Sequence, residues 1–163
     1  MIRVGGASII PAIVGALAAV FIAVFGATLT DVGPWYQGLA KPGWTPPDAA
    51  FGLIWTVILA MWALAAVKAW QAAPDHRRAD QLIGLFAFNG FLNILWSLLF
   101  FRLQRPDWAL VEVVFLWLSV LALVVVCSRY SRFAGALLVP YLVWVSVAAF
   151  LNWEVVRLNP PFA

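Results

Sequence analysis

The chain of 163 residues is 65% hydrophobic and only 10% charged, with a mean hydropathy of +0.97. This balance excludes an ordinary water-soluble domain and predicts a single domain embedded in a membrane. The net charge of +3 does not indicate nucleic-acid binding, because the basic residues stand singly or in pairs at the ends of apolar runs. Cys127 is the single cysteine, which excludes an intrachain disulfide and a cysteine-based metal site.

The first apolar run covers about residues 8–29. The hydrophobic core of a signal peptide spans only about 7–15 residues, so we interpret this longer run as a retained transmembrane helix. Small residues recur every four positions along it, at Gly15, Ala19, Ala23 and Ala27. Such a stripe allows close approach of another helix or of a flat ligand, and helix packing is the interpretation we favour.

Residues 30–48 form the one long segment that does not read as a span. Four prolines and three glycines disfavour regular structure here, while Trp35, Tyr36 and Trp44 argue against disorder. We therefore predict a structured lid over one end of a pocket within the membrane. At its end, Thr45-Pro46-Pro47-Asp48 predicts a helix start with Thr45 as the cap.

The remaining apolar runs predict four more spans, at about residues 49–71, 80–101, 108–128 and 133–158. Pro140 interrupts the last of them and predicts a kink. The expected fold is an all-α membrane protein: a bundle of five transmembrane helices with a long structured loop between the first and second, in one domain over residues 1–163. Six basic residues on one side against four on the other favour a cytoplasmic N-terminus.

The chain offers little for catalysis. His76 is the single histidine and stands beside two arginines in a turn, and no metal-binding cluster, nucleophile–base pair or phosphate-binding loop is visible. We therefore predict no catalytic residue, no metal and no required cofactor. Two acids fall within spans. Glu154 precedes Arg157 by three residues and should pair with it, whereas Glu112 either is buried or reaches the interface.

Tryptophan is the unusual component, with ten copies in the chain. An interfacial belt explains Trp70, Trp108 and Trp153. Five others lie deeper in the spans: Trp55, Trp62, Trp96, Trp117 and Trp144. Buried indole N–H groups, like the amides of Asn93 and Asn152, require hydrogen-bond partners. Two interpretations stay open: these side chains join helices, or they line a cavity for a large planar ligand.

The order of these motifs resembles the TspO/MBR family of membrane proteins. The resemblance rests on Trp35-Tyr36-x-x-Leu39-x-Lys41-Pro42-x-Trp44-x-Pro46-Pro47, then Phe51 and Trp55, then Asn93-Ile94-Leu95-Trp96, Phe100-Phe101, Trp108-Ala109-Leu110-Val111-Glu112, Pro140-Tyr141-Leu142-x-Trp144, Leu151-Asn152 and Arg157-Leu158-Asn159. These motifs span nearly the whole chain in the family's order and are similar to those of bacterial-type members.

The resemblance implies a five-helix, integral multi-pass membrane protein, often dimeric, with a ligand cavity beneath the first loop. It implies tetrapyrrole ligands such as protoporphyrin IX or haem, and also sterols and benzodiazepine-type compounds; the other partners would be the lipid bilayer and a second copy in a homodimer, with no nucleic acid. The ligand-binding residues carried over are Ala23, Trp35, Tyr36, Trp55, Asn93, Trp96, Trp108, Trp144, Ala148 and Asn152.

One departure weakens part of this expectation. Animal members carry a proposed cholesterol motif with a central tyrosine near the end of the last helix, and Trp153 stands at that position here. We therefore expect tetrapyrrole binding more than sterol binding. A tetrapyrrole-binding receptor or regulator is the preferred function, followed by a light-dependent porphyrin-degrading enzyme that uses tryptophan, and then by a porphyrin or sterol translocator.

Overall fold

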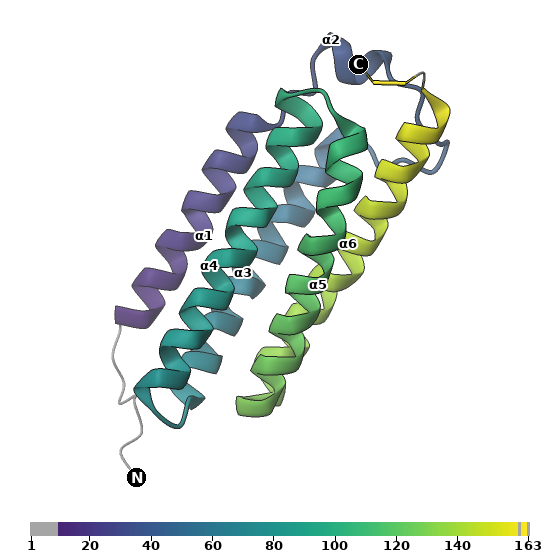
Figure 1. Cartoon of the computed structure of the whole chain (residues 1–163). Helices are drawn as coiled ribbons and strands as arrows, with labels where there is room; N and C mark the ends of the chain where they lie inside the picture. Colours follow the sequence, from purple (N-terminus) through teal and green to yellow (C-terminus); the bar gives the residue numbers. More distant parts are fainter. Residues whose placement is uncertain (1–9, 160, 163) are drawn as a thin grey trace.

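Five long helices run side by side in the computed structural model, which describes residues 10–159, 161 and 162 (Figure 1). They are α1 (Ile10–Leu29), α3 (Asp48–Ala72), α4 (His76–Ser97), α5 (Pro106–Tyr130) and α6 (Arg132–Leu158). Each is long and apolar enough to cross a membrane, α4 being counted together with the turn that follows it to Arg102. The predicted all-α, five-span bundle is confirmed; the expected start of the first span at residue 8 lies outside the described residues.

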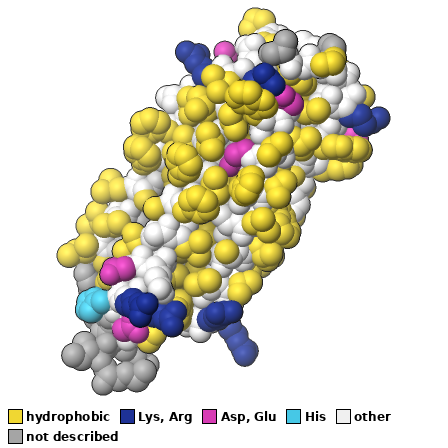
Figure 2. All heavy atoms as spheres, viewed as in Figure 1, with side chains coloured by type: hydrophobic (Ala, Val, Ile, Leu, Met, Phe, Trp, Pro, Cys, Tyr) yellow, Lys and Arg dark blue, Asp and Glu magenta, His cyan; other side chains and the backbone are white. Residues whose placement is uncertain are grey.

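The surface of the bundle matches a membrane environment. Figure 2 shows hydrophobic side chains along the length of the visible face, while Lys and Arg gather toward its two ends. Large apolar side chains that face outward include Leu53, Phe91 and Phe115, each more than half exposed. In water such a surface would be an aggregation site, so burial against lipid is what stabilises it.

The segment between α1 and α3 contains a short helix, α2 (Pro34–Gly38), at the end of the bundle where α6 finishes (Figure 1). The expectation that proline and glycine suppress regular structure is wrong over these five residues. Pro34 occupies the first helical position, where its missing N–H removes no hydrogen bond and its fixed φ suits the helix. Proline here starts a helix instead of preventing one.

The start of α3 also differs from the prediction. The helix begins at Asp48 after Pro47, and no side chain caps it. Thr45 instead donates from Oγ1 to the carbonyl oxygen of Pro42 at 2.7 Å, which closes a turn within the loop. The aromatic ring of Trp44 stacks on Phe150 of α6, with 5.5 Å between the ring centroids. These contacts hold the loop against the bundle.

A π-helical turn, η1 (Leu98–Arg102), extends α4, and sequence patterns gave no sign of it. The N–H of Leu103 donates to the carbonyl oxygen of Leu98 at 2.9 Å, the five-residue spacing of a π-helix. Gln104 then adopts a positive φ of 54°, which turns the chain into α5. The turn brings Phe100 and Phe101 against Trp96, at centroid distances of 5.1 and 6.0 Å.

Candidate ligand-binding cavity

A cavity of about 480 Å³ lies between α1, α3, α4 and α6, with the loop that carries α2 at one end. Its volume falls within the range typical of small-molecule sites. Seven of the ten predicted site residues contribute to its wall: Ala23, Tyr36, Trp55, Asn93, Trp96, Trp144 and Ala148. The structure therefore brings together residues from four helices and the loop that are up to 125 positions apart in the chain, counting from Ala23 to Ala148.

Aromatic rings in edge-to-face contact form one side of this cavity. Trp55 and Trp144 lie 6.5 Å apart between centroids, with an angle of 86° between their planes. Phe51 meets Trp144 edge-on at 5.6 Å, and Trp55 meets Tyr141 at 6.0 Å. This geometry is the one that aromatic quadrupoles favour, so each ring restrains the next. The wall is pre-formed and offers flat π surfaces to a ligand.

Polar groups are few and well defined. Asn93 donates from Nδ2 to the hydroxyl oxygen of Tyr141 at 3.1 Å, which orients the amide at the cavity wall. The indole N–H of Trp144 is buried and has no hydrogen-bond partner among the described residues. An unsatisfied buried donor is destabilising by about 1–3 kcal/mol.

Tyr36 closes the loop end of the cavity. Its side chain is buried, and burial raises the pKa of the hydroxyl above its usual value, with the negative charge of Asp48 raising it further. The hydroxyl is therefore a neutral donor at all ordinary pH values. Lys41 Nζ donates to the carbonyl oxygen of Tyr36 at 2.6 Å and lies 4.1 Å from the centre of its ring. One cation thus holds both the backbone and the ring of Tyr36.

Three predicted site residues lie outside the cavity wall. Trp35 packs edge-on against Phe100 at 6.2 Å. Trp108 is 53% exposed, with the guanidinium of Arg105 lying 4.4 Å from its ring centre. Trp108 lies outside the wall because of the placement of α5. Figure 1 shows α4 between α1 and α5, and within the described residues α5 contributes nothing to the wall.

Asn152, the third of these, acts behind the wall. It accepts a hydrogen bond from Trp96 Nε1 at 3.2 Å and donates from Nδ2 to the carbonyl oxygen of Pro106 at 2.8 Å. Because Trp96 lines the cavity, Asn152 fixes the orientation of a wall residue and ties it to the start of α5. Its role in the structure is positioning.

Several wall residues were missed from the sequence. Polar side chains among them are Thr30, Asp48, Thr56 and Ser97. Ser97 stands four residues after Asn93, so helical periodicity alone could have placed both on one face of α4. Asp48 accepts a hydrogen bond from Gln37 Nε2 at 2.9 Å, which links the loop to the start of α3. No sequence signal predicted that link.

The small-residue stripe of α1 serves two purposes. Gly15 and Ala19 are buried, and a Cβ added at Gly15 would lie 3.3 Å from Val67 of α3. Further along, Ala23 and Ala27 line the cavity. The packing interpretation is therefore confirmed for the half of the helix with Gly15 and Ala19, while approach of a flat ligand to the half with Ala23 and Ala27 stays a prediction.

The deep tryptophans likewise divide between the two interpretations. Three of them join neighbouring helices through their indole N–H groups: Trp62 donates to Asn89 at 2.9 Å, Trp96 to Asn152 at 3.2 Å and Trp117 to Ser146 at 2.9 Å. Trp55, Trp96 and Trp144 line the cavity. Trp96 does both, so joining helices and lining a cavity are not alternatives in this bundle.

A second, larger cavity of about 570 Å³ opens between α1, α3 and α4. Its lining consists of apolar side chains and glycines, with Trp62 and Trp70 as the largest members. It contains none of the ten predicted site residues. Since specific recognition requires a few placed polar groups in an apolar wall, the cavity with Asn93, Ser97 and Tyr36 is the candidate site.

Comparison with known proteins agrees with this architecture. The model of the TspO/MBR family matches residues 11–158. The chain is 38% identical over 126 residues to the tryptophan-rich protein TspO of Chlorobaculum tepidum, covering 77% of this chain and 80% of that protein. It is 36% identical over 149 residues to the tryptophan-rich sensory protein of Cereibacter sphaeroides (88% and 92%), and 35% identical over 126 residues to the translocator protein of Sus scrofa (77% and 75%).

Proposed function

The chain belongs to the TspO/MBR family and is an integral multi-pass membrane protein, and on this premise we propose that it is a receptor for tetrapyrroles such as protoporphyrin IX or haem. The observation that carries the proposal is the cavity of about 480 Å³ walled by Trp55, Trp96 and Trp144. A planar macrocycle buries most of its surface against flat rings, and apolar burial stabilises by about 25 cal/mol per Å².

The polar groups of the wall suit the rest of such a ligand. Asn93 uses Nδ2 toward Tyr141, which leaves its Oδ1 as an acceptor for pyrrole N–H groups. The propionates of a tetrapyrrole require positive charge, and Lys41 stands beside Tyr36 at the loop end of the cavity. We therefore orient the macrocycle among the tryptophans with its carboxylates toward Lys41. Sterols and benzodiazepine-type compounds would use the same apolar wall without that cation.

A second candidate function is light-dependent degradation of the bound porphyrin. The observation that favours it is the number of indole rings in the wall, because a ring in contact with an excited macrocycle is the nearest electron donor. The edge-to-face pair of Trp55 and Trp144 would share that role. Binding alone requires only the shape and polarity of the cavity, so it remains the first proposal.

One experiment separates these functions. The purified protein is titrated with protoporphyrin IX in the dark while tryptophan fluorescence is followed, and the complex is then illuminated for product analysis. Saturable quenching with an unchanged macrocycle supports the receptor. A product that forms only with the protein present supports the enzyme. Absence of saturable quenching contradicts the proposed cavity ligand.

A further inference from the structure

The polar side chains at the end of α1 and the start of α3 offer hydrogen-bond acceptors to the cavity. Thr30 Oγ1 donates its proton to the carbonyl oxygen of Gly26 at 2.7 Å, and Thr56 Oγ1 donates to that of Gly52 at 2.8 Å. A hydroxyl group has one proton and two lone pairs, so each threonine has lone pairs left for a ligand and no proton. Both threonines line the cavity, together with the carboxylate of Asp48.

Asp48 is the one acid in this wall within the described residues, and it has no cationic partner among them. Both ion pairs of the described chain lie elsewhere, at α5 and α6. Gln37 Nε2 donates to Asp48 Oδ2 at 2.9 Å, which uses one of about four lone-pair sites of the carboxylate. Asp48 stands in the first turn of α3, and its full negative charge exceeds the partial positive charge, about one half, of that helix end. This part of the wall is therefore negative.

Gln37 holds Asp48 beside the end of α1. The same Nε2 atom donates to the carbonyl oxygen of Val32 at 3.2 Å, so one nitrogen contacts both the chain just beyond α1 and the carboxylate that begins α3. Thr30 lies two residues before Val32. The carboxyl end of a helix carries a partial negative charge, and the last turn of α1 contains no basic residue to balance it. Both helix ends at this place thus favour a cation.

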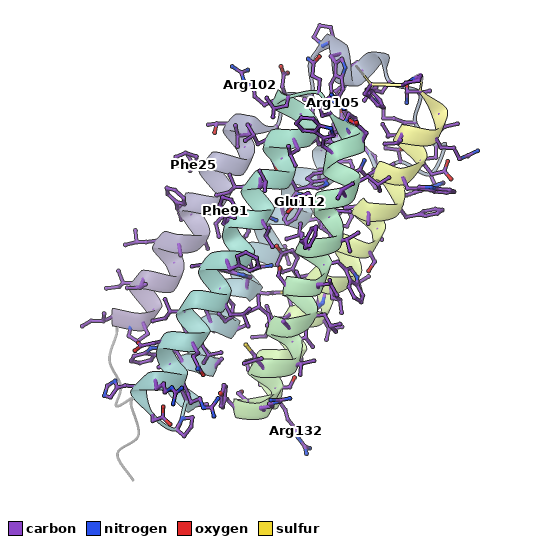
Figure 3. The ribbon with its side chains drawn as sticks, viewed as in Figure 1. Phe25, Phe91, Arg102, Arg105, Glu112 and Arg132 are labelled. Carbon is purple, nitrogen blue, oxygen red and sulfur yellow. The ribbon has the colours of Figure 1, made fainter. Side chains whose placement is uncertain are left out.

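Two glycines leave room for a ligand between α1 and α3 at this level. Gly26 and Gly52 line the cavity, and outside each glycine's own turn no described atom lies within 4 Å of an added Cβ. Toward the other end of the same helix pair, a Cβ added to Gly15 would lie 3.3 Å from Val67. The side chain of Phe25 points away from the bundle (Figure 3), so it does not fill the space beside Gly26. The two helices pack closely at one end and leave open space at the loop end.

We propose that this space binds the protonated amine of a ligand whose aromatic body lies among the cavity tryptophans. A primary ammonium group has a positive charge and three N–H donors. Asp48 accepts a charge-assisted hydrogen bond from it, and Thr30 on the opposite helix offers a second acceptor. Thr56 lies eight residues after Asp48, about 12 Å further along the axis of α3, and accepts from an N–H or O–H group on the aromatic body.

The ligand class is thus a planar aromatic cation, which differs from a tetrapyrrole with its two propionates. The inference uses the cavity of the proposed function but not its ligand. The carboxylate of Asp48 attracts an ammonium group and repels a propionate. The two proposals therefore predict different effects when this one charge is removed.

A matched pair of probes tests the amine site. 1-Pyrenemethylamine and 1-pyrenemethanol share one aromatic body and differ in having an ammonium or a hydroxyl group. The protein in nanodiscs of zwitterionic phosphatidylcholine is titrated with each probe while tryptophan fluorescence is followed, and protein-free nanodiscs correct for partition into lipid. We expect a Kd about tenfold lower for the amine, as for a hydrogen bond to a charged group. Equal affinities overturn the amine site.

Asp48→Asn tests the residue. The amide keeps an oxygen acceptor for Gln37 but removes the charge, so we expect the Kd of the amine to rise about tenfold and that of the alcohol to stay unchanged. Asp31→Asn is the matched control: it removes the same charge outside the cavity wall and keeps the acceptor for the N–H of Gly33. Equal loss of amine binding in both variants would assign the effect to net charge and overturn the role of Asp48.

Gly52→Leu tests the place of the site. The side chain enters the open space, so both pyrene probes should bind more weakly. Gly84→Leu is the control, because Gly84 also has open space around an added Cβ but lies outside the cavity wall. Unchanged binding in Gly52→Leu overturns the placement of the ligand between α1 and α3.

Protoporphyrin IX separates this inference from the proposed function. Its Kd in Asp48→Asn should equal that of the wild type or be lower, because a repelling charge is removed. Saturable porphyrin binding without preference for the amine overturns the amine site and leaves the receptor in place; the reverse result supports the amine site alone. Weaker binding of the porphyrin, the amine and the alcohol alike in Asp48→Asn would indicate a distorted cavity and overturn the charge explanation.

Discussion

Ala40 and Asn159 are joined by two reciprocal hydrogen bonds although 119 residues separate them. The N–H of Ala40 donates to Asn159 Oδ1 at 3.0 Å, and Asn159 Nδ2 donates to the carbonyl oxygen of Ala40 at 3.1 Å. Nδ2 also donates to the carbonyl oxygen of Val155 at 2.7 Å, which fixes the side chain on the end of α6. One asparagine thus fastens the loop at the end of the cavity to the last helix.

Replacing this asparagine should loosen the loop. In Asn159→Ala both bonds to Ala40 are lost, and at about 1 kcal/mol for each we expect ligand dissociation to be about thirtyfold faster. Asn159→Asp keeps the acceptor but loses the donor, so its rate should be intermediate. Stopped-flow measurement of porphyrin release from nanodisc-embedded protein checks this order. Equal rates in all three proteins would mean that the other contacts hold the loop without Asn159.

Trp144→Phe should weaken ligand binding without unfolding the bundle. The substitution keeps an aromatic ring at the cavity wall but removes the indole N–H, which has no partner within the described protein. The smaller phenyl ring removes apolar contact area from the wall, and we expect a Kd about fivefold to tenfold higher. Fluorescence titration with protoporphyrin IX measures the Kd of each variant.

Trp153→Phe is the control for this substitution. Trp153 is 45% exposed and stacks on Phe150 outside the cavity, so its replacement should leave the Kd unchanged. An unchanged Kd in Trp144→Phe as well would show that Trp144 is only a packing residue.

The hydrogen bonds that Asn89 of α4 makes with Trp62 of α3 and Ser119 of α5 should stabilise the core. Asn89 is fully buried, accepts from Trp62 Nε1 at 2.9 Å and donates to Ser119 Oγ at 2.8 Å. Asn89→Ala leaves the Trp62 donor and the Ser119 acceptor without their partner, so the free energy of unfolding should fall by about 1–2 kcal/mol. Ser119→Ala removes the acceptor for Asn89 and the Oγ donor to the Leu116 carbonyl oxygen, but it leaves the bond between Trp62 and Asn89 in place and should lower the free energy of unfolding less.

A double-mutant cycle tests whether the bond between Trp62 and Asn89 is the cause. If it is, Trp62→Phe combined with Asn89→Ala destabilises by less than the sum of the single effects. Additive effects in thermal unfolding of detergent-solubilised protein would assign the loss to packing alone.

The first turn of α6, where it lies against the end of α5, should not tolerate a side chain at residue 135. A Cβ added to Gly135 would lie 2.9 Å from Ser128 Cβ and 3.1 Å from Ser128 Cα, so the helices would have to move apart. We expect Gly135→Ala to lower the unfolding temperature and Ser128→Gly in the same chain to restore part of it. Gly84→Ala is the matched control, because nothing lies within 4 Å of its added Cβ. An unchanged unfolding temperature in Gly135→Ala would contradict the close approach of Gly135 to Ser128.

The sequence by itself determined the membrane class, the number of spans and the local pairs. Hydropathy over about 20 residues is a property of composition, so it locates a span whatever that span packs against. The pairing of Glu154 with Arg157 follows from helical spacing alone. Seven of the ten site residues that the resemblance of the motifs carried over line the candidate cavity, and helical spacing did not select them; their binding of a ligand stays a prediction.

The tertiary structure decided how each helix is rotated and which elements meet. Whether Trp108 faces the cavity depends on the side of α4 on which α5 packs. The hydrophobic periodicity of α5 does not predict that side. Glu112 could have been buried or interfacial from the sequence, and the packing of α5 on α4 and α6 buries it. The loop is fastened by Asn159, a contact across 119 residues. Hydrophobic burial in a membrane is non-directional, so it sets the spans but leaves rotation and pairing to the packing of specific side chains.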